Sequence, residues 1–148
     1  MDLVTKVSLT TELPISAELA RSLAAKPELF AYVVRPYLRV PGMSIPEHIE
    51  PGALGSARLW LFGIVPLWTH RLRIVSLDEF EIYTNEHGGP LRVWNHRLTF
   101  APLGPNSCRY TDEIEIEDGL HGLATRAFIH LMFRHRHRRW RALARVLA

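Results

Sequence analysis

The sequence predicts a single α+β domain, residues 1–148, in which an antiparallel sheet wraps around a long C-terminal helix. A length of 148 residues is typical of one domain with one core. Alternation of apolar and polar residues extends from Gly55 to Glu117, and its breaks are too short for helical crossovers, so neighbouring strands should be antiparallel. After Asp118 the apolar residues recur every three or four positions, which indicates a helix.

The N-terminal segment predicts one strand and two short helices. Residues Leu3 to Leu9 alternate weakly with a period of two, and Pro14 ends this strand. Ser16 is a suitable N-cap for the first helix, and Pro27 is suited to the first turn of the second. Both helices therefore precede the main sheet.

The segment from Arg35 to Gly55 predicts a long loop. It contains four prolines and three glycines, a density that helix interiors and central strands do not tolerate. Loops of this length inside a small domain are usually functional. We therefore expect this loop to form the mouth of a binding site, and the sequence leaves open whether it is a mobile lid.

The strands expected after Gly55 are separated by four breaks, and a long helix follows them. The breaks are expected at Pro66, Leu77 to Asp78, His87 to Pro90, and Pro102 to Asn106. The helix is expected from Gly119 to Leu147, with Asp118 as its N-cap. At ~1.5 Å per residue it would be ~40 Å long, enough to cross the whole sheet.

Two of these strands place polar side chains on a face that is otherwise apolar. Alternation puts His96 on the same face as Trp94, Leu98 and Phe100, and Asp112 on the same face as Cys108, Tyr110, Ile114 and Ile116. A hairpin centred near Gly104 sets Phe100 opposite Cys108 and His96 opposite Asp112. An unpaired buried charge is costly, so we expect a structural pair. The alternative is a polar anchor for a ligand, or a base held by a carboxylate.

Aromatic and polar residues on the inward faces predict a cavity. Each large aromatic residue alone is an ordinary core residue, but tryptophan, histidine, tyrosine and aspartate together are more typical of a cavity lining than of an aliphatic core. The expected ligand-binding residues are Trp60, Trp68, His70, Trp94, His96, Leu98, Tyr110, Asp112, Phe128 and Met132.

No metal ion or cofactor is expected. The segment from Glu47 to Glu50 offers one histidine, and His135 and His137 are two positions apart on a helix, whereas helical zinc pairs use spacings such as i, i+4. The sequence has no glycine-rich phosphate loop, nucleophile elbow or zinc ribbon. Cys108 has no obvious activating neighbour, so we expect a small core residue.

The net charge of +3 hides an arginine-rich C-terminus that follows an acidic strand. Arginines crowd the stretch from Arg134 to Arg145, which leaves an RNA or membrane adaptor as a weaker alternative. More often such a run is a solvated helix end that pairs with neighbouring acids, here Glu113, Glu115 and Glu117. We therefore expect no nucleic-acid partner. The oligomeric state stays open, a homodimer included.

A cytoplasmic protein without a membrane span is expected. A single thiol allows no intramolecular disulfide, which favours a reducing compartment. The first ten residues lack the basic and apolar regions of a signal peptide. The most apolar run, Leu59 to Trp68, is much shorter than the ~20 residues that a spanning helix needs.

The order of elements resembles the START-like helix-grip superfamily, also called SRPBCC or polyketide-cyclase-like, over the whole chain. Short motifs are similar to those of uncharacterised bacterial ligand-binding SRPBCC proteins, namely Gly89-Pro90, Trp94-x-His96, Asp112-Glu113-Ile114 and Phe133-Arg134-His135-Arg136. The resemblance implies a seven-stranded antiparallel sheet that grips the last helix. It also implies a cavity that in relatives holds lipids, sterols, polyketides or plant hormones, and some relatives are cyclases or hydratases.

Two functions are consistent with this resemblance, because the fold alone does not separate them. We favour a non-catalytic carrier or sensor that binds an apolar small molecule, such as a lipid or polyketide, with His96 and Asp112 orienting its polar end. The alternative is a cyclase, dehydratase or hydrolase that uses His96 as general acid or base and Asp112 to fix its tautomer.

Overall fold

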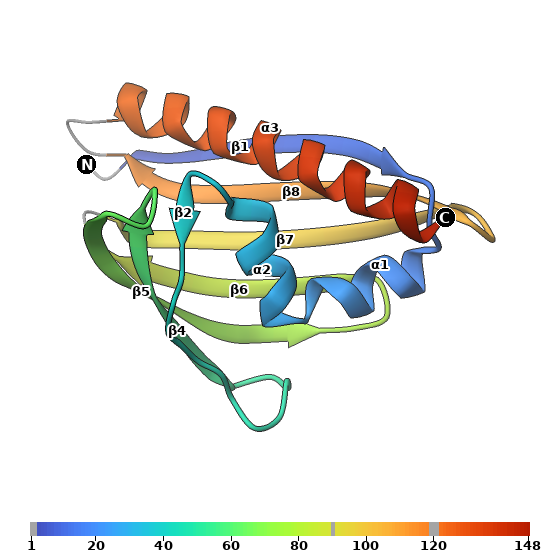
Figure 1. Ribbon diagram of the computed structural model, residues 1–148, viewed down its shortest axis with the longest axis horizontal. Coiled ribbons are helices and arrows are strands. Elements are labelled where there is room, and N and C mark those ends of the chain that lie inside the picture. Colours follow the sequence, from blue (N-terminus) through green and yellow to red (C-terminus); the bar gives the residue numbers. More distant parts are fainter. Residues whose placement is uncertain (1–2, 90, 119–121) are drawn as a thin grey trace.

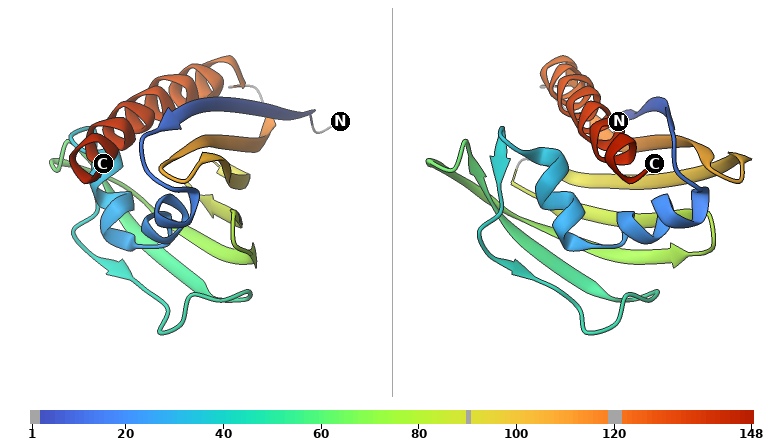
Figure 2. Two further views of the ribbon diagram at one scale, coloured as in Figure 1. Left: turned by 90° about the vertical axis from the view of Figure 1, so that its right-hand side faces the viewer. Right: turned by 45° about the vertical axis from the view of Figure 1, so that its right-hand side comes forward.

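An antiparallel sheet curls around a concave side on which three helices lie (Figures 1 and 2). This computed structural model describes residues 3–89, 91–118 and 122–148. The helices are α1 (Ala17–Ala24), α2 (Pro27–Val34) and α3 (Gly122–Leu147). The strands are β1 (Leu3–Leu13), β2 (Leu38–Arg39), β3 (Met43–Ser44), β4 (Leu54–Leu61), β5 (Val65–Leu77), β6 (Glu81–Gly88), β7 (Leu91–Gly104) and β8 (Ser107–Asp118).

The strands follow the order β1-β8-β7-β6-β5-β4-β2, and β3 pairs with β4 beside β2. Both β2 and β3 are two residues long and are antiparallel to β4 on the same edge. They therefore act as one interrupted strand. With this interruption, the helix-grip fold expected from the sequence, a seven-stranded sheet with a C-terminal helix and two short helices after the first strand, is confirmed.

The segment from Arg35 to Gly55 is not a continuous loop, because it contains both β2 and β3. Pro41 lies between these two short strands. Proline is tolerated there because an edge position does not require its missing N–H for the sheet ladder. The prediction of a loop without strands was therefore wrong at the edge of the sheet.

The local signals at the N-terminus are confirmed. The strand β1 continues to Leu13, four residues beyond its expected end, and stops before Pro14. The backbone N–H of Leu19 donates to Ser16 Oγ at 3.1 Å, so Ser16 caps α1. Pro27 is the first residue of α2.

Two prolines that were expected to end strands lie inside strands. Pro66 belongs to β5, and the preceding turn is at residues 62–64. Pro102 belongs to β7, next to an irregularity in the pairing with β8. Bulges and strand beginnings accommodate a residue that cannot donate to the ladder. Pro90, in the turn expected after His87, lies outside the described residues.

The pairing of β7 with β8 is shifted by two residues from the expected hairpin. Phe100 is opposite Tyr110 instead of Cys108, because the turn lies at residues 105–106, beyond Gly104. A shift of two residues leaves every side chain on its original face. The inward faces of both strands are therefore buried as expected.

The long helix α3 packs against β1 and α2. The helix start expected at Gly119, with the N-cap side chain of Asp118, lies outside the part that the structure describes. Towards the C-terminus, Trp140 packs on the rings of Phe100 and Tyr110, with centroids 6.4 and 5.3 Å away. None of the described helices is long and apolar enough to cross a membrane.

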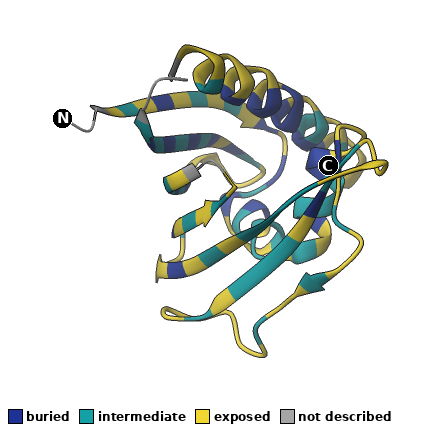
Figure 3. Ribbon diagram, turned by 90° about the vertical axis from the view of Figure 1, so that its left-hand side faces the viewer, coloured by how far each residue is buried: buried dark blue, intermediate teal, exposed yellow. Residues whose placement is uncertain are grey.

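Burial is uneven across the sheet. Fully buried residues concentrate on β7, β8 and the inner face of α3, whereas most residues of β4 and β5 are half-buried or exposed (Figure 3). The concave side of β4 and β5 is therefore only partly covered by protein.

Candidate functional site

The concave interior contains two adjoining cavities. The larger, of about 570 Å³, lies between α2, β4, β5, β7 and α3, and we call it the large chamber. The smaller, of about 190 Å³, lies between α2, the segment Arg35 to Gly55 and the middle of the sheet, and we call it the small chamber. Ligand pockets in proteins typically measure about 300–1,000 Å³. The large chamber alone is thus of ligand-binding size.

Four polar residues line both chambers, and we call them the polar belt: His70, Glu86, His96 and Arg136. They come from β5, β6, β7 and α3, respectively. On β7, Trp94 lies on the large-chamber side of the belt and Leu98 on the small-chamber side. The belt therefore crosses the interior at the boundary between two apolar spaces.

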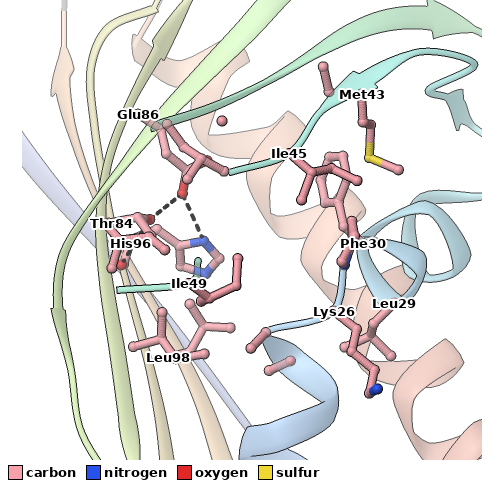
Figure 4. Close-up of a pocket in the computed structure, with 18 of the residues that line it drawn as sticks. Lys26, Leu29, Phe30, Met43, Ile45, Ile49, Thr84, Glu86, His96 and Leu98 are labelled. Atoms are coloured by element: carbon pink, nitrogen blue, oxygen red, sulfur yellow. Dashed lines mark hydrogen bonds and ion pairs between the residues drawn. The ribbon is translucent and has the colours of Figure 1, made fainter. Parts of the chain in front are cut away.

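Glu86 is the acceptor at the centre of the belt. Its Oε1 lies 2.7 Å from His70 Nε2, and its Oε2 lies 3.4 Å from His96 Nδ1. Thr84 Oγ1 donates to Glu86 Oε2 at 2.5 Å. Figure 4 shows Glu86, Thr84 and His96 together on the sheet, facing Phe30 and Ile45 across the small chamber.

Asp112 extends this network beneath the chamber wall. Its Oδ1 lies 2.6 Å from His96 Nε2, and its Oδ2 lies 2.8 Å from His137 Nε2. The side chain of Asp112 is fully buried. A continuous chain of hydrogen bonds, with one ion pair between Glu86 and His96, thus runs from His70 on β5 to His137 on α3.

The two ring nitrogens of His96 face two different carboxylates, an arrangement that favours a proton on each nitrogen. Burial acts to lower the pKa of His96, but the hydrogen bonds and charges of Asp112 and Glu86 raise it above its ordinary value. Burial likewise acts to raise the pKa of Glu86, and the hydrogen bonds of His70 and His96 lower it well below its usual range.

Arg136 is a buried cation of the belt, with 9% of its surface exposed. Burial acts to lower the pKa of its guanidinium, but the carboxylate of Asp112 raises it. The same charge helps to lower the pKa of Asp112 well below its usual range, against the effect of burial. The expectation that the arginine run is a solvated helix end was therefore wrong at Arg136.

Three buried polar atoms of the large chamber have no hydrogen-bonding partner among the described residues: Trp68 Nε1, His70 Nδ1 and Arg136 Nε. Trp140 Nε1, at the small chamber, and Tyr110 Oη, beside Asp112, also have no hydrogen-bonding partner among the described residues. Leaving a buried donor unsatisfied costs about 1–3 kcal/mol, so such atoms are rare in folded proteins. Four of these five atoms belong to residues that line the chambers, so the lining is a candidate position for an additional polar group.

The structure brings most of the expected site residues to the chambers. The large chamber is lined by Trp68, His70, Trp94, His96, Phe128 and Met132, and the small chamber by His70, His96 and Leu98. Tyr110 and Asp112 are buried behind the lining. Trp60 lines neither chamber, because alternation along β4 directs Leu59 and Leu61 inward instead. The roles of these residues in binding stay predictions.

The contact between His96 and Asp112 is present although the expected register is not. Asp112 is directly opposite Leu98, and the hydrogen bond to His96 is diagonal. Sequence reasoning missed Glu86, Arg136 and His137. An inward position of Glu86 is indicated by its alternation with Ile82 and Thr84 along β6. Inward positions of Arg136 and His137 are indicated by their helical spacing of three and four from Phe133 and Trp140.

Within the described residues, no group of three or more histidines, cysteines or acids is arranged to hold a metal ion. Cys108 is fully buried. Burial, with the nearby charge of Glu18, raises the pKa of its thiol to about 11. Because the thiolate is the reactive form, this cysteine fits a structural position in the core.

Comparison with solved structures shows the fold directly. A START superfamily protein from Mycobacterium smegmatis has a TM-score of 0.77 at 19% identity, and the match covers 97% of this chain and 99% of that chain. The ZhuI aromatase/cyclase from Streptomyces sp. R1128 has a TM-score of 0.73 at 12% identity, over 97% and 94% of the two chains. A norcoclaurine synthase from Thalictrum flavum has a TM-score of 0.70 at 11% identity, over 97% and 96%.

Comparison at the level of sequence adds one family. No curated protein matches the sequence. One family model does, with the description "Domain of unknown function (DUF8410)", over residues 19–144. This range includes all three helices apart from two residues of α1 and the last turn of α3, together with every strand except β1. The chain therefore belongs to the DUF8410 family, and it has the START-like helix-grip fold.

Proposed function

We propose that this protein binds an apolar small molecule, such as a lipid or a polyketide, in its two chambers and acts as a carrier or sensor. The observation that supports this proposal most is the unfilled interior beside β4 and β5, where apolar side chains surround a small set of convergent polar atoms. Pockets of this composition are typical of small-molecule sites. A cytoplasmic location is part of the proposal, since the only cysteine is a buried thiol.

The sizes of the chambers set the size of the molecule. An apolar cavity of about 150 Å³ is able to hold a benzene ring, so the small chamber, at about 190 Å³, accommodates one ring or a short branched chain. The large chamber, at about 570 Å³, accommodates two or more such groups. The proposed ligand is therefore considerably larger than a single ring.

Two apolar rims offer routes of entry. Ile45 and Ile49, from the segment Arg35 to Gly55, are exposed and line the small chamber (Figure 4). Phe128 and Leu131 of α3 are exposed and line the large chamber. In this proposal the ligand enters beneath the segment Arg35 to Gly55, whose irregular backbone is easier to displace than the central sheet.

Native mass spectrometry of protein purified from its own host tests this proposal. We expect a retained small molecule on the wild type. We expect none on Leu61→Trp, which fills the large chamber from β4, and normal retention on Leu54→Trp, an exposed position on the same strand. The proposal would be contradicted if the wild-type protein is always free of ligand and its melting temperature does not change when lipids or polyketides are added.

An acid–base enzyme is the second candidate, and the state of His70 favours it. His70 lines both chambers, its Nε2 lies 2.7 Å from Glu86 Oε1, and its Nδ1 has no partner among the described residues, so His70 is the residue proposed to exchange a proton with a bound molecule. His96, expected in this role from the sequence, has both nitrogens against carboxylates. The aromatase/cyclase and the synthase with the same fold are consistent with a cyclase or dehydratase.

The retained molecule separates the two candidates. An enzyme should convert it, and His70→Gln should stop that conversion while the molecule is still bound. A carrier should return it chemically unchanged after prolonged incubation, with the wild type and His70→Gln behaving alike. Mass spectra of the extracted molecule before and after incubation measure the difference.

A further inference from the structure

We infer that the ligand has a neutral hydrogen-bonding oxygen between two largely apolar parts. This inference rests on the proposed binding function and deepens it. It depends on where the polar belt lies, on which of its atoms lack partners, and on the charge that the belt already carries.

The belt lies between the chambers on each element that contributes to it. On β5, Trp68 lines the large chamber, His70 lines both, and Leu72 lines the small chamber. On α3, Met132 lines the large chamber, Arg136 lines both, and Trp140 lines the small chamber. A molecule that occupies both chambers therefore passes the belt with its middle, and its two ends meet mostly apolar side chains, together with Arg138 in the large chamber and Lys26 in the small one.

The unpartnered atoms define the hydrogen-bonding character of that middle. Trp68 Nε1 and Arg136 Nε can only donate, so the ligand must offer an acceptor. His70 donates through Nε2 to Glu86, which leaves Nδ1 as an acceptor for a hydroxyl group. A ketone oxygen satisfies the donors, and an alcohol or enol satisfies the donors and His70 together.

The charges of the belt argue against a carboxylate in this position. Two buried carboxylates, Glu86 and Asp112, already face His96 at 3.4 and 2.6 Å, and Arg136 is a buried guanidinium of the same belt. A ligand carboxylate would add a third negative charge to this belt, and burial of a further charge is costly. A ketone or an alcohol meets the free donors without adding a charge.

Three probes with one carbon skeleton test the inference: 1,3-diphenylpropan-2-one, 1,3-diphenylpropan-2-ol and 1,3-diphenylpropane. Each has two rings, and only the central oxygen differs. Hydrogen bonds that involve a charged donor are the stronger ones, so calorimetry should give the ketone and the alcohol a Kd about tenfold below that of the hydrocarbon. Dodecanoic acid, with its oxygens at one end, should bind more weakly than the ketone.

The variant Trp68→Phe removes one donor and keeps an aromatic ring. It should reduce the advantage of the ketone over the hydrocarbon, while Trp60→Phe, outside both chambers, should leave it unchanged. In NMR spectra, the signal that is missing from Trp68→Phe identifies the indole N–H of Trp68. In the wild type this signal should move downfield when the ketone is added and should not move when the hydrocarbon is added. This signal reports a hydrogen bond directly and does not depend on the stability of a variant.

The outcomes separate this inference from the proposed function. Equal affinity for the ketone and the hydrocarbon would overturn the inference of a central oxygen, and so would tighter binding of dodecanoic acid than of the ketone. In both cases the chambers would still be a binding site for apolar molecules. Failure of all four probes to bind would remove the proposed function, and this inference with it.

Discussion

The two sides of the curled sheet bury the same kinds of residues to different depths. On the closed side, formed by β1, β7 and β8 with α1 and the C-terminal half of α3, inner residues such as Phe100, Tyr110 and Ile114 are fully buried. On the open side, formed by β4 and β5 with α2 and the edge strands, inner residues such as Leu67 and Leu72 are only half-buried (Figure 3). Both sides carry aromatic and aliphatic residues at alternate positions.

The difference comes from what lies above each side. On the closed side, α1 contacts β7 and β8, and α3 contacts β1, so helices rest directly on the strands. On the open side, α2 and the segment Arg35 to Gly55, whose short strands β2 and β3 join the sheet only at its edge, surround the two chambers. The same alternation therefore forms a core where a helix covers it and a cavity where it does not.

Truncation of the closed core should have the largest effect. Trp140 is fully buried against the rings of Phe100 and Tyr110, so Trp140→Ala should lower the free energy of unfolding by about 3–5 kcal/mol, as large-to-small substitutions of buried aromatics do. Urea denaturation followed by circular dichroism measures the loss. A loss below about 1 kcal/mol would show that this side is no better packed than the other.

Removal of the Asp112 carboxylate should cost almost as much. Asp112→Asn leaves His96, His137 and Arg136 without their shared anion, and breaking a buried ion pair in this way costs about 3 kcal/mol or more. The matched control is Glu113→Gln, the neighbouring position on β8, whose partly exposed contact with Lys6 should contribute less than about 1 kcal/mol. Equal losses in the two variants would contradict the account of the buried network.

The belt should give stability a maximum between about pH 5 and 6.5. Glu86 and Asp112 have lowered pKa values, so their contribution is present above their unfolded pKa values and is lost as the pH falls towards the folded ones. His96 has a raised pKa, so its contribution is complete below its unfolded pKa of 6.5 and is lost as the pH rises through the folded value.

Denaturation of the wild type at pH 5, 6, 7, 8 and 9 should therefore show a free energy of unfolding that declines on the alkaline side, where the contribution of His96 is lost. His96→Phe should flatten this decline. His48→Gln, at an exposed histidine, should leave it as in the wild type. A wild-type free energy of unfolding that is constant from pH 6 to 9 would rule out a charged His96 in the folded state.

Truncation of the open side should have the smallest effect on stability. Leu67 lines the large chamber and is already partly surrounded by space, so Leu67→Ala in ligand-free protein should cost less than about 1.5 kcal/mol, below the range for tightly packed leucines. The same variant should weaken binding of 1,3-diphenylpropane. A loss equal to that of Trp140→Ala would mean that the open side is packed like a core.

Alternation made most of the closed side predictable from the sequence. The inward faces of β7 and β8 were assigned correctly even though the pairing is shifted by two residues, because that shift does not exchange the faces. The contact between His96 and Asp112 was predictable for the same reason. These predictions depend on a period of two, which long regular strands preserve.

The open side was less predictable because its structure depends on tertiary contacts. The short edge strands β2 and β3 form against β4 within a proline-rich segment, and no local pattern marks them. Arg136 was expected in solvent because its neighbours are arginines, yet buried carboxylates on the sheet hold it inside. Trp60 was expected inside with the other aromatic residues of the lining, although the alternation of β4 gives that place to Leu59.

A crystal structure of the protein purified from its own host, without delipidation, tests the central claim most directly. We expect electron density for a non-protein molecule in both chambers, in contact with Trp68, His70 and Arg136. Chambers closed by side chains of the segment Arg35 to Gly55, with no bound molecule, would contradict the claim that the open side of the sheet is a binding site.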